Sequence, residues 1–571
     1  MQMMQIRDRI RQAIAKSAGV SIDEVILEYP EREEFGDYST SIALKLKGGK
    51  QLAEKIASAI KPDEVIAKTE VAGPGFVNVF IRSDCLVSQL VEVLVQGQDF
   101  GNNLALKDKR VLIEYAHPNT HKEMHIGHMR TLITGEAIAR IQEAAGAKVF
   151  RANYQGDIGP HVAKAIWGTM QILNEEGLTW EDAENWPVEK RAHLLGMGYV
   201  TGNQRYEENA KEIEAMNTSL YQKSVDVWEI YTRTRRWSLE YYETFYRRFG
   251  TKFDKLFFES EVAEAGKALV EEMTGKVFET SQGATIFDGE KYGLHKRVFV
   301  TAEGNPTYEG KEMALAFAQY ELFPFDTNIH VVANEQTEYF RVVFKALEMI
   351  DPKMAVREYH LPMGMVSLVG RKMASRTGDI ITVDGLLEEV KEEAGKLISS
   401  EMTGEEKEKI AEGVTLAAVK YSTLKIQPTL NAVFDMKQSV SLEGNSGPYL
   451  LYTYARISSV LTKSRVKANV QSSEYEPNSE ELAVLRWMTR FPEVAEEAAV
   501  KYAPNLICNY LYELAQRFNG FYNKYSILGG KEEANAGDEG TRGFRLALAS
   551  ATGQVLKNGL GLLGIDVLDR M

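Results

Sequence analysis

The stretch that decides the fold is Val111-Leu112-Ile113-Glu114-Tyr115-Ala116-His117-Pro118-Asn119-Thr120-His121-Lys122-Glu123-Met124-His125-Ile126-Gly127-His128-Met129-Arg130. It begins with an apolar run typical of a buried strand and continues into a loop that contains a proline. Apolar residues at helical spacing then predict a helix that begins near Gly127 and includes Ile133, Ala137 and Ile141. A strand, loop and helix in this order form the unit with which α/β folds bind nucleotides.

The two histidines of this stretch, His125 and His128, are three residues apart and can lie on one face of the first helical turn. Unpaired amides at a helix start favour a phosphate, and Gly127 leaves room for a flat ring against the backbone. Two nearby histidines are equally compatible with a metal site or an ordinary surface. The pattern alone therefore indicates nucleotide binding without excluding these alternatives.

Length and cysteine usage point to a large intracellular protein. A chain of 571 residues is longer than one hydrophobic core usually spans, so three or four domains are expected. Cys85 and Cys508 are far apart and the chain has no Cys-x-x-Cys motif, which argues against a protein-bound zinc and against a disulfide framework. We therefore expect a cytoplasmic protein.

Charge and hydropathy narrow the class further. The net charge of -14 argues against a uniformly basic nucleic-acid binder, although local basic faces remain compatible with it. No apolar segment is long enough for a membrane span, and residues 1–19 have the pattern of a charged amphipathic helix rather than a signal peptide. We expect no contact with a membrane.

Composition shifts along the chain suggest three domains. Residues 1–100 predict a small α+β domain with a strand over 73–80, and 101–400 predict a nucleotide-binding type of α/β domain with a helical insertion at about 166–250. Further strands are expected at 328–333 and 363–368. Residues 401–571 predict a helical domain, with helix from Lys407 to the end and a polar break at 467–479.

The insertion contains a run rich in tryptophan, tyrosine and arginine. Such a stripe usually reflects helix packing with arginine stems along the apolar face, and contact with RNA is the alternative. Its members are Trp228, Tyr231, Arg235, Arg236, Trp237, Tyr241 and Tyr242.

A second constellation follows the apolar run 363–368. Gly370-Arg371-Lys372-Met373-Ala374-Ser375-Arg376-Thr377-Gly378 has glycine at both ends and predicts a mobile basic loop. Cations on such a loop can close over a triphosphate and stabilise charge as pyrophosphate leaves. A basic loop alone is usually solvated surface, but the pair of motifs is far more specific than either.

Together the two motifs resemble the signatures of class I aminoacyl-tRNA synthetases, and the resemblance narrows to the arginyl-tRNA synthetases over nearly the whole chain. The further residues that carry it are Pro118-Asn119, Lys122, Asn153-Tyr154-Gln155-Gly156-Asp157-Ile158-Gly159, Glu259-Ser260, Gly283-Ala284, Tyr308, Glu335-Gln336, Gly444-Asn445-Ser446-Gly447-Pro448-Tyr449, Tyr452, Ala455-Arg456 and Leu563-Gly564-Ile565. The resemblance implies a Rossmann-type catalytic domain, an N-terminal domain that contacts the tRNA elbow and a helical anticodon-binding domain.

The resemblance also implies the substrates and the reaction. Arginine would attack the α-phosphate of magnesium-bound ATP, and arginyl-adenylate would then pass its arginyl group to tRNA(Arg), with bound tRNA needed for the first step. Positioning and charge stabilisation suffice for such chemistry, so no covalent enzyme intermediate or resident metal is expected. We expect a monomer.

The resemblance assigns residues to each ligand. It places Lys122, His125, His128, Lys372 and Arg376 in catalysis, and His125, Gly127, His128, Met373 and Ser375 at ATP. A guanidinium is a planar fork of donors that carboxylates match best. The arginine contacts would be Asn119, Glu259, Tyr308, Glu312 and Gln336. The tRNA contacts would be Phe76 and Asn78 in the first domain, and Tyr449, Arg456, Arg517 and Tyr522 in the last.

Each assignment has a structural alternative. Glu259 can be an ordinary helix-start carboxylate, and Gln336 a polar residue that closes a strand. Phe76 can be a buried strand residue and Asn78 a turn amide. The chain also departs from the family pattern, with Glu312 where aspartate is usual and with Ala374 and Thr377 where the loop often has serine and lysine. Lys122 can supply the missing cation.

Two other classes of protein compete with this interpretation. A related nucleotidyltransferase would share the histidine motif but would not need a helical tail of this length. A non-catalytic RNA-binding scaffold derived from a synthetase would not need the intact histidine pair and the basic loop.

Overall fold

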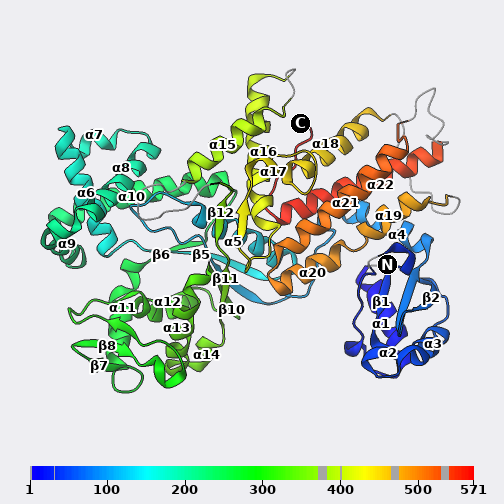
Figure 1. Ribbon diagram of the computed structural model, residues 1–571, viewed down its shortest axis with the longest axis horizontal. Coiled ribbons are helices and arrows are strands. Elements are labelled where there is room, and N and C mark those ends of the chain that lie inside the picture. The colour runs from blue at the N-terminus through cyan, green and yellow to red at the C-terminus, as the bar shows by residue number, and fades with distance from the viewer. Residues whose placement is uncertain are drawn as a thin grey trace.

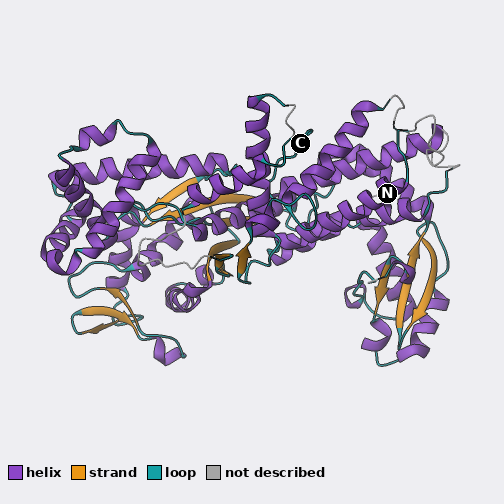
Figure 2. Cartoon of the chain, turned by 45° about the horizontal axis from the view of Figure 1, so that its top comes forward, coloured by secondary structure: helices purple, strands orange, loops and turns teal. Residues whose placement is uncertain are grey.

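The computed structural model describes residues 3–30, 32–370, 382–398, 402–464, 468, 475–528 and 539–571. The molecule is elongated, with the catalytic region at one end and the N-terminal domain beneath the C-terminal helices at the other (Figure 1). Strands gather in the two regions that the sequence predicts to be mixed α/β, and helices form the rest (Figure 2). In the described part of the chain, every helix is too short or too polar to span a lipid bilayer.

The catalytic region is built on a five-stranded parallel sheet in the order β11-β10-β4-β5-β6. The chain first forms the central strand β4, then adds β5 and β6 on one side of it, and finally adds β10 and β11 on the other side. This reversal between β4 and β10 opens a crevice at the carboxyl ends of the strands, where ligands bind in such sheets. The bounds are β4 Arg110–Glu114, α5 Ile126–Ala144, β5 Lys148–Gln155, β6 Lys255–Phe258, β10 Thr327–Ala333 and β11 Glu358–Met363. The predicted Rossmann-type architecture is confirmed.

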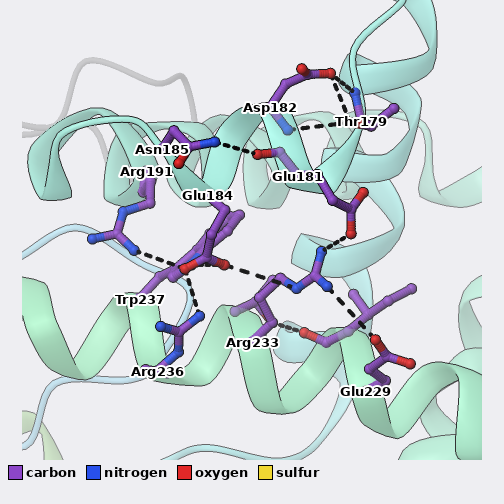
Figure 3. Close-up of polar contacts among 12 residues, drawn as sticks. Thr179, Glu181, Asp182, Glu184, Asn185, Arg191, Glu229, Arg233, Arg236 and Trp237 are labelled. Atoms are coloured by element: carbon purple, nitrogen blue, oxygen red, sulfur yellow. Dashed lines mark hydrogen bonds and ion pairs between the residues drawn. The ribbon is translucent and has the colours of Figure 1, made fainter.

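A helical insertion separates β5 from β6, as predicted. Its members are α6 Pro160–Glu176, α7 Trp180–Glu184, α8 Val188–Gln204, α9 Tyr206–Tyr221 and α10 Val225–Arg248. Along α10, Tyr231, Trp237 and Tyr241 are buried. Arg233 and Arg236 bind Glu181 and Glu184 of α7, at 2.8 and 2.7 Å (Figure 3). The aromatic and arginine-rich stripe therefore serves helix packing and ion pairing between α7 and α10.

A second insertion between β6 and β10 contains a small antiparallel sheet that the sequence did not predict. Its helices pack on the catalytic sheet, and α11 and α12 approach closely because both carry glycine where they cross. A Cβ at Gly266 would lie 2.3 Å from the carbonyl oxygen of Gly310. The bounds are α11 Glu259–Glu272, β7 Glu279–Ser281, β8 Ala284–Phe287, β9 Arg297–Val300 and α12 Tyr308–Leu322. Two further helices, α13 Thr337–Ile350 and α14 Pro352–Ala355, lie between β10 and β11.

Two predictions for this part of the chain are wrong in detail. They are a single strand over 363–368 and helix throughout from Lys407. The chain turns at Gly364, whose backbone lies against Leu430, and β12 then pairs with β13 in a separate two-stranded sheet. The polar break at 467–479 lies largely outside the described residues. The bounds are β12 Val366–Leu368, α15 Val383–Gly395, α16 Gly404–Leu424, β13 Ala432–Phe434, α17 Met436–Ser439, α18 Gly447–Lys463, α19 Ser479–Met488, α20 Phe491–Lys501, α21 Pro504–Lys524 and α22 Glu539–Leu562.

The N-terminal domain has a three-stranded sheet of order β1-β3-β2 and is anchored to the C-terminal helices. Glu493 of α20 accepts hydrogen bonds from the hydroxyls of Tyr29 and Tyr38, each at 2.5 Å, and Arg486 binds Asp37 at 2.9 Å. These buried polar contacts fix how the two domains meet. The bounds are α1 Met3–Ala18, β1 Tyr38–Thr40, α2 Ile42–Lys45, α3 Gly49–Ala59, β2 Ile66–Ala72, β3 Phe76–Ile81 and α4 Ser83–Gln96.

Candidate active site

The histidine pair lies at the start of α5, at the carboxyl end of the central strand. The rings of His125 and His128 stack with centroids 3.7 Å apart. His125 Nδ1 accepts from the backbone amides of Gly127 and His128, at 3.1 and 3.4 Å. The ring proton of a neutral His125 must then sit on Nε2, which is left to donate to a ligand. Burial, helped by the Lys122 ammonium, lowers the pKa of His125 to about 4, so the ring is neutral at pH 7.

The loop before α5 has an unusual backbone. Ala116, His117 and His121 all have positive φ, between 49° and 77°, a region that side chains other than glycine rarely adopt. Such conformations persist where the surroundings hold them, as at ligand sites. Tyr242 of α10 secures this loop by donating to the carbonyl oxygens of Asn119 and Lys122, at 2.6 and 2.8 Å.

The chain that follows the predicted basic loop lies beside the histidine pair. Lys372, Met373, Ser375 and Arg376 lie outside the described residues. The chain resumes at Thr382, which pairs with His125 in an isolated antiparallel bridge, and the amide of Val383 donates to the carbonyl oxygen of Met124 at 3.0 Å. The fold therefore places Thr382 and Val383, which follow the second signature in sequence, next to the first signature.

Lys122 lies between the histidine pair and the helical insertion. Its ammonium is 4.1 Å from the centre of the Tyr199 ring of α8. It is also close enough to lower the pKa of both His125 and His128, although burial is the larger cause in each case. The predicted position of Lys122 on the loop that faces the nucleotide agrees with this geometry, and Tyr199 is a neighbour that the sequence did not indicate.

Glu259, the first predicted partner of the arginine side chain, already has a cationic partner. It is the first residue of α11, and its Oε2 accepts from Nζ of Lys311 at 2.6 Å, with both side chains 4% exposed. Burial raises the pKa of Glu259 to about 7, and the Lys311 ammonium opposes that rise. Lys311 was missed from the sequence, although it stands within the same helical turn as Tyr308 and Glu312.

Glu312, the second predicted partner, is buried in a network of acidic groups around His330. The imidazole binds Glu114 through Nδ1 at 3.2 Å and Glu358 through Nε2 at 2.7 Å, which raises its pKa well above the usual range despite burial. Burial, together with the Glu114 carboxylate, raises the pKa of Glu312 to about 8. Glu114, Glu312 and His330 lie close enough to suggest a metal site. Because both ring nitrogens already bind carboxylates, we assign a hydrogen-bonded charge network instead.

Two tyrosines lie near both Glu259 and Glu312. Tyr339 of α13 donates to Glu312 at 3.4 Å. The Tyr154 hydroxyl of β5 is buried without a hydrogen-bond partner among the described residues, and its pKa is raised by burial and then by the charges of Glu259 and Glu312. A buried hydroxyl without a partner is costly, so it marks a place for a polar ligand. Neither tyrosine was predicted.

The other predicted arginine contacts surround this place to different degrees. Asn119 is half-buried, and a Cβ on Gly156 would lie 2.2 Å from its Oδ1 and 3.0 Å from Glu259 Oε1, so these two polar groups share one wall. Tyr308 is 51% exposed at the start of α12. Gln336 is exposed at the end of the 3-10 turn Asn334–Gln336 that follows β10.

The predicted tRNA contacts of the first domain differ in accessibility. Phe76 is half-buried at the start of β3. Asn78 is 4% exposed, and its Oδ1 accepts from the Ser39 hydroxyl at 2.7 Å. Asn78 lies inside strand β3 and not in a turn, and its amide already has a partner inside the domain. This geometry argues against a contact of Asn78 with tRNA.

Three of the predicted contacts in the last domain form one cluster between α18 and α21. Asn519 joins them, since it donates to the Tyr449 hydroxyl at 3.0 Å and accepts from Arg456 at 2.7 Å. The Arg456 guanidinium lies 4.8 Å from the Tyr452 ring and 5.1 Å from the Tyr522 ring. Arg517 lies apart, over the Trp487 ring at 4.1 Å.

Comparison with known proteins agrees with this geometry. Residues 89–436 match the model of the family described as tRNA synthetases class I (R), catalytic domain. Residues 4–81 match the arginyl tRNA synthetase N terminal domain, and 450–571 match the DALR anticodon binding domain. The fold and the site thus define a class I aminoacyl-tRNA synthetase.

Comparison with individual proteins identifies the family within this class of synthetases. The chain is 32% identical to the arginine--tRNA ligase of Treponema denticola, over 96% of this chain and 95% of that protein. It is 30% identical to the arginine--tRNA ligase of Bacteroides thetaiotaomicron over the whole of both. The arginyl-tRNA synthetase of Thermus thermophilus superposes with a TM-score of 0.81 at 25% identity, covering 99% of this chain and all of that one. The chain belongs to the arginyl-tRNA synthetase family.

Proposed function

We propose that this enzyme attaches L-arginine to tRNA(Arg) through arginyl-adenylate, with ATP as its magnesium complex, and that it works as a cytoplasmic monomer. The observation that supports this most strongly is the pair of buried carboxylates, Glu259 and Glu312, beside the crevice that holds the histidine pair. A guanidinium is the substrate group that two such carboxylates fit best.

ATP would lie against the start of α5. The Nε2 proton of His125 can donate to a phosphate oxygen because its Nδ1 is held by two backbone amides. Neutral imidazoles orient the nucleotide but cannot balance its charge. That task falls to Lys122 and, on the basic loop, to Lys372 and Arg376, which would stabilise charge as pyrophosphate departs.

Arginine would place its side chain between Glu259 and Glu312 and its carboxylate toward ATP. The Tyr154 and Tyr339 hydroxyls lie near both acidic groups and can complete the hydrogen bonds of the pocket. Asn119 and Gln336, at the ends of neighbouring strands, would bind the amino-acid head group. The attack then needs only correct placement, since the arginine carboxylate is itself the nucleophile.

The tRNA would extend along the molecule toward the N-terminal domain. The cluster of Tyr449, Arg456 and Tyr522 has the composition that reads unpaired bases by stacking and by arginine contacts. Phe76 and the surrounding sheet would contact the tRNA elbow. The contacts of Glu493 with Tyr29 and Tyr38 would hold that domain at a fixed place relative to the anticodon-binding helices.

The test is ATP–pyrophosphate exchange with each of the twenty amino acids, with and without tRNA(Arg). We expect exchange with arginine alone and only when tRNA is present. Exchange with another amino acid would overturn the substrate assignment. No exchange with any amino acid, in a protein that binds tRNA, would favour the non-catalytic scaffold.

A further inference from the structure

We propose that Lys311 is a positioning residue of the arginine pocket, an internal cation that keeps Glu259 ionised and occupies one of its two oxygens so that the other is presented to the substrate. The inference rests on the proposed function, because it concerns how the pocket is prepared for a guanidinium. The contact of α11 with α12 directs the side chain of Lys311 into that pocket.

The fold forces this placement. Gly266 of α11 and Gly310 of α12 let the two helices approach until a Cβ at Gly266 would lie 3.0 Å from Cα of Lys311. The lysine stem is therefore enclosed by the helix contact, and its ammonium reaches the first residue of α11. Its surroundings are those of a cation site, with Glu259 Oε2 at 2.6 Å and the Tyr308 and Tyr221 rings at 5.4 and 5.9 Å.

The two oxygens of Glu259 have different surroundings. Oε2 is bound by Lys311, whereas Oε1 has no hydrogen-bond partner within the part of the chain that the structure describes and lies on the side of Gly156 and Asn119. Asn119 is a predicted contact of the amino-acid substrate. Lys311 thus covers Oε2, which faces the helix contact. It leaves Oε1, which faces Asn119, free to bind the substrate.

Without a cation, this carboxylate would be poorly ionised at neutral pH. It is 3% exposed, and burial disfavours the charged form of a carboxyl group. A protonated Glu259 could not accept the two parallel hydrogen bonds of a guanidinium. Lys311 opposes that effect from inside the protein, before arginine arrives, so that arginine binding needs less proton release from Glu259 than it would without the lysine.

Other groups around Glu259 do not replace the lysine. Asp157 adds negative charge and so makes ionisation harder, and its own cationic partner is Arg235, at 2.9 Å. The tyrosines that face the pocket stay neutral, since burial raises their pKa values. These tyrosines are Tyr154 of β5, Tyr308 of α12 and Tyr339 of α13. The other groups near Lys311 and Glu259 are Tyr221 of α9 and, on α12, Glu312.

The experiment is arginine binding by calorimetry to the full enzyme and to Lys311→Met between pH 6.5 and 9.5, in buffers of different ionisation heat. We expect the ratio of the variant's Kd to the parent's to fall as pH rises, by up to about tenfold per pH unit below the pKa that Glu259 then adopts. The variant should release more protons per arginine bound than the parent, by up to about one. A variant that only distorts the pocket would give a ratio independent of pH, and that result would overturn the proposal.

Companion variants keep the test decisive. Lys311→Arg retains the cation and should bind arginine within about threefold of the parent at every pH. Lys311→Gln has no charge and should show the same pH dependence as Lys311→Met, so it replaces that variant if the latter fails to fold. Lys345→Met removes a lysine that pairs with Glu348 on the surface of α13, at 2.8 Å, and should change neither Kd nor proton release.

A readout without substrate separates this inference from the proposed function. At pH 7 the infrared spectrum of Lys311→Met should contain a protonated-carboxyl band that is absent from the double variant Lys311→Met/Glu259→Gln. If the parent binds no arginine, the proposed function fails, whereas the band still tests the lysine. If the parent binds arginine and the band is missing, the assignment of Lys311 is wrong and the proposed function stands.

Discussion

The proposed arginine pocket and the proposed anticodon-side cluster would recognise their ligands by opposite physical means. In the pocket, Glu259, Lys311 and Glu312 are each less than 10% exposed, and their charges are set by burial and by one another. In the cluster, Tyr452 is 37% exposed, and Arg456 is half-buried near two aromatic rings. A buried charge depends strongly on its partner, whereas an exposed stacking surface distributes its contribution over several groups.

The largest effect should follow from Glu259→Gln. The change leaves the Lys311 ammonium buried without its counter-ion, which costs about 3 to 5 kcal/mol of unfolding free energy. It also removes one acceptor of the guanidinium, so the KM for arginine should rise strongly while the KM for ATP changes little. Urea unfolding and steady-state kinetics check both effects.

The double variant Glu259→Gln/Lys311→Met is the control for that loss. It removes both charges, so most of the stability should return while arginine binding stays weak. A double variant as unstable as Glu259→Gln alone would show that the ion pair is not the reason for the loss.

Lys122→Ala tests the charge beside the histidine pair. Losing a donor that stabilises developing charge typically lowers a rate by about a hundredfold to a thousandfold. We expect that fall in the rate of adenylate formation, measured in a single turnover, with unchanged stability. Tyr199→Phe keeps an aromatic ring under the ammonium and should react like the parent. If Lys122→Ala also reacts like the parent, the charge must come from Lys372 and Arg376.

Arg456→Ala should have a smaller effect, and that effect should fall on tRNA binding and not on arginine binding. It removes the cation between Tyr452 and Tyr522, so tRNA binding should weaken by about 1 to 3 kcal/mol, the usual contribution of one stacking group. The KM for tRNA should rise, and arginine affinity should not change. Arg247→Ala, an exposed arginine of α10, is the matched control. An equal loss in both variants would indicate general charge attraction instead of a base contact.

Glu312 makes stability depend on pH. Its pKa, about 8, is above the ordinary carboxyl value, so its contribution to stability is complete below about pH 4.5 and is lost as the pH rises through 8. Glu312→Gln imitates the protonated form and should exceed the parent by on the order of 2 kcal/mol at pH 9, with the difference vanishing at low pH. Chemical denaturation at several pH values measures this. A constant difference would show that Glu312 does not titrate in this range.

Much of the site could be predicted because its signals are local. The run from Val111 to Tyr115 and the histidines at the start of α5 fixed a strand, a loop and a helix, and the sheet order places their junction at the crevice. The small sheet β7-β8-β9 was missed because its strands are three or four residues long, too short to show alternation.

The sequence could not predict in the same way which side chains form hydrogen bonds or ion pairs with one another. Lys311 meets Glu259 only because Gly266 and Gly310 let two helices touch, and nothing in the spacing of 52 residues indicates that contact. The burial of Asn78 against Ser39 likewise depends on how β1 pairs with β3. Residue type identified the candidates, but tertiary packing decided which atoms were free.

The most direct test of the central claim, that two buried carboxylates select a guanidinium, compares arginine with citrulline. Citrulline has nearly the same shape but carries a neutral urea group in place of the cation. Calorimetry with the parent enzyme, with tRNA(Arg) present and ATP left out so that nothing reacts, should give a Kd for citrulline at least about a hundredfold above that for arginine, because the carboxylates would lose their cationic partner. Equal affinity for the two compounds would contradict the account.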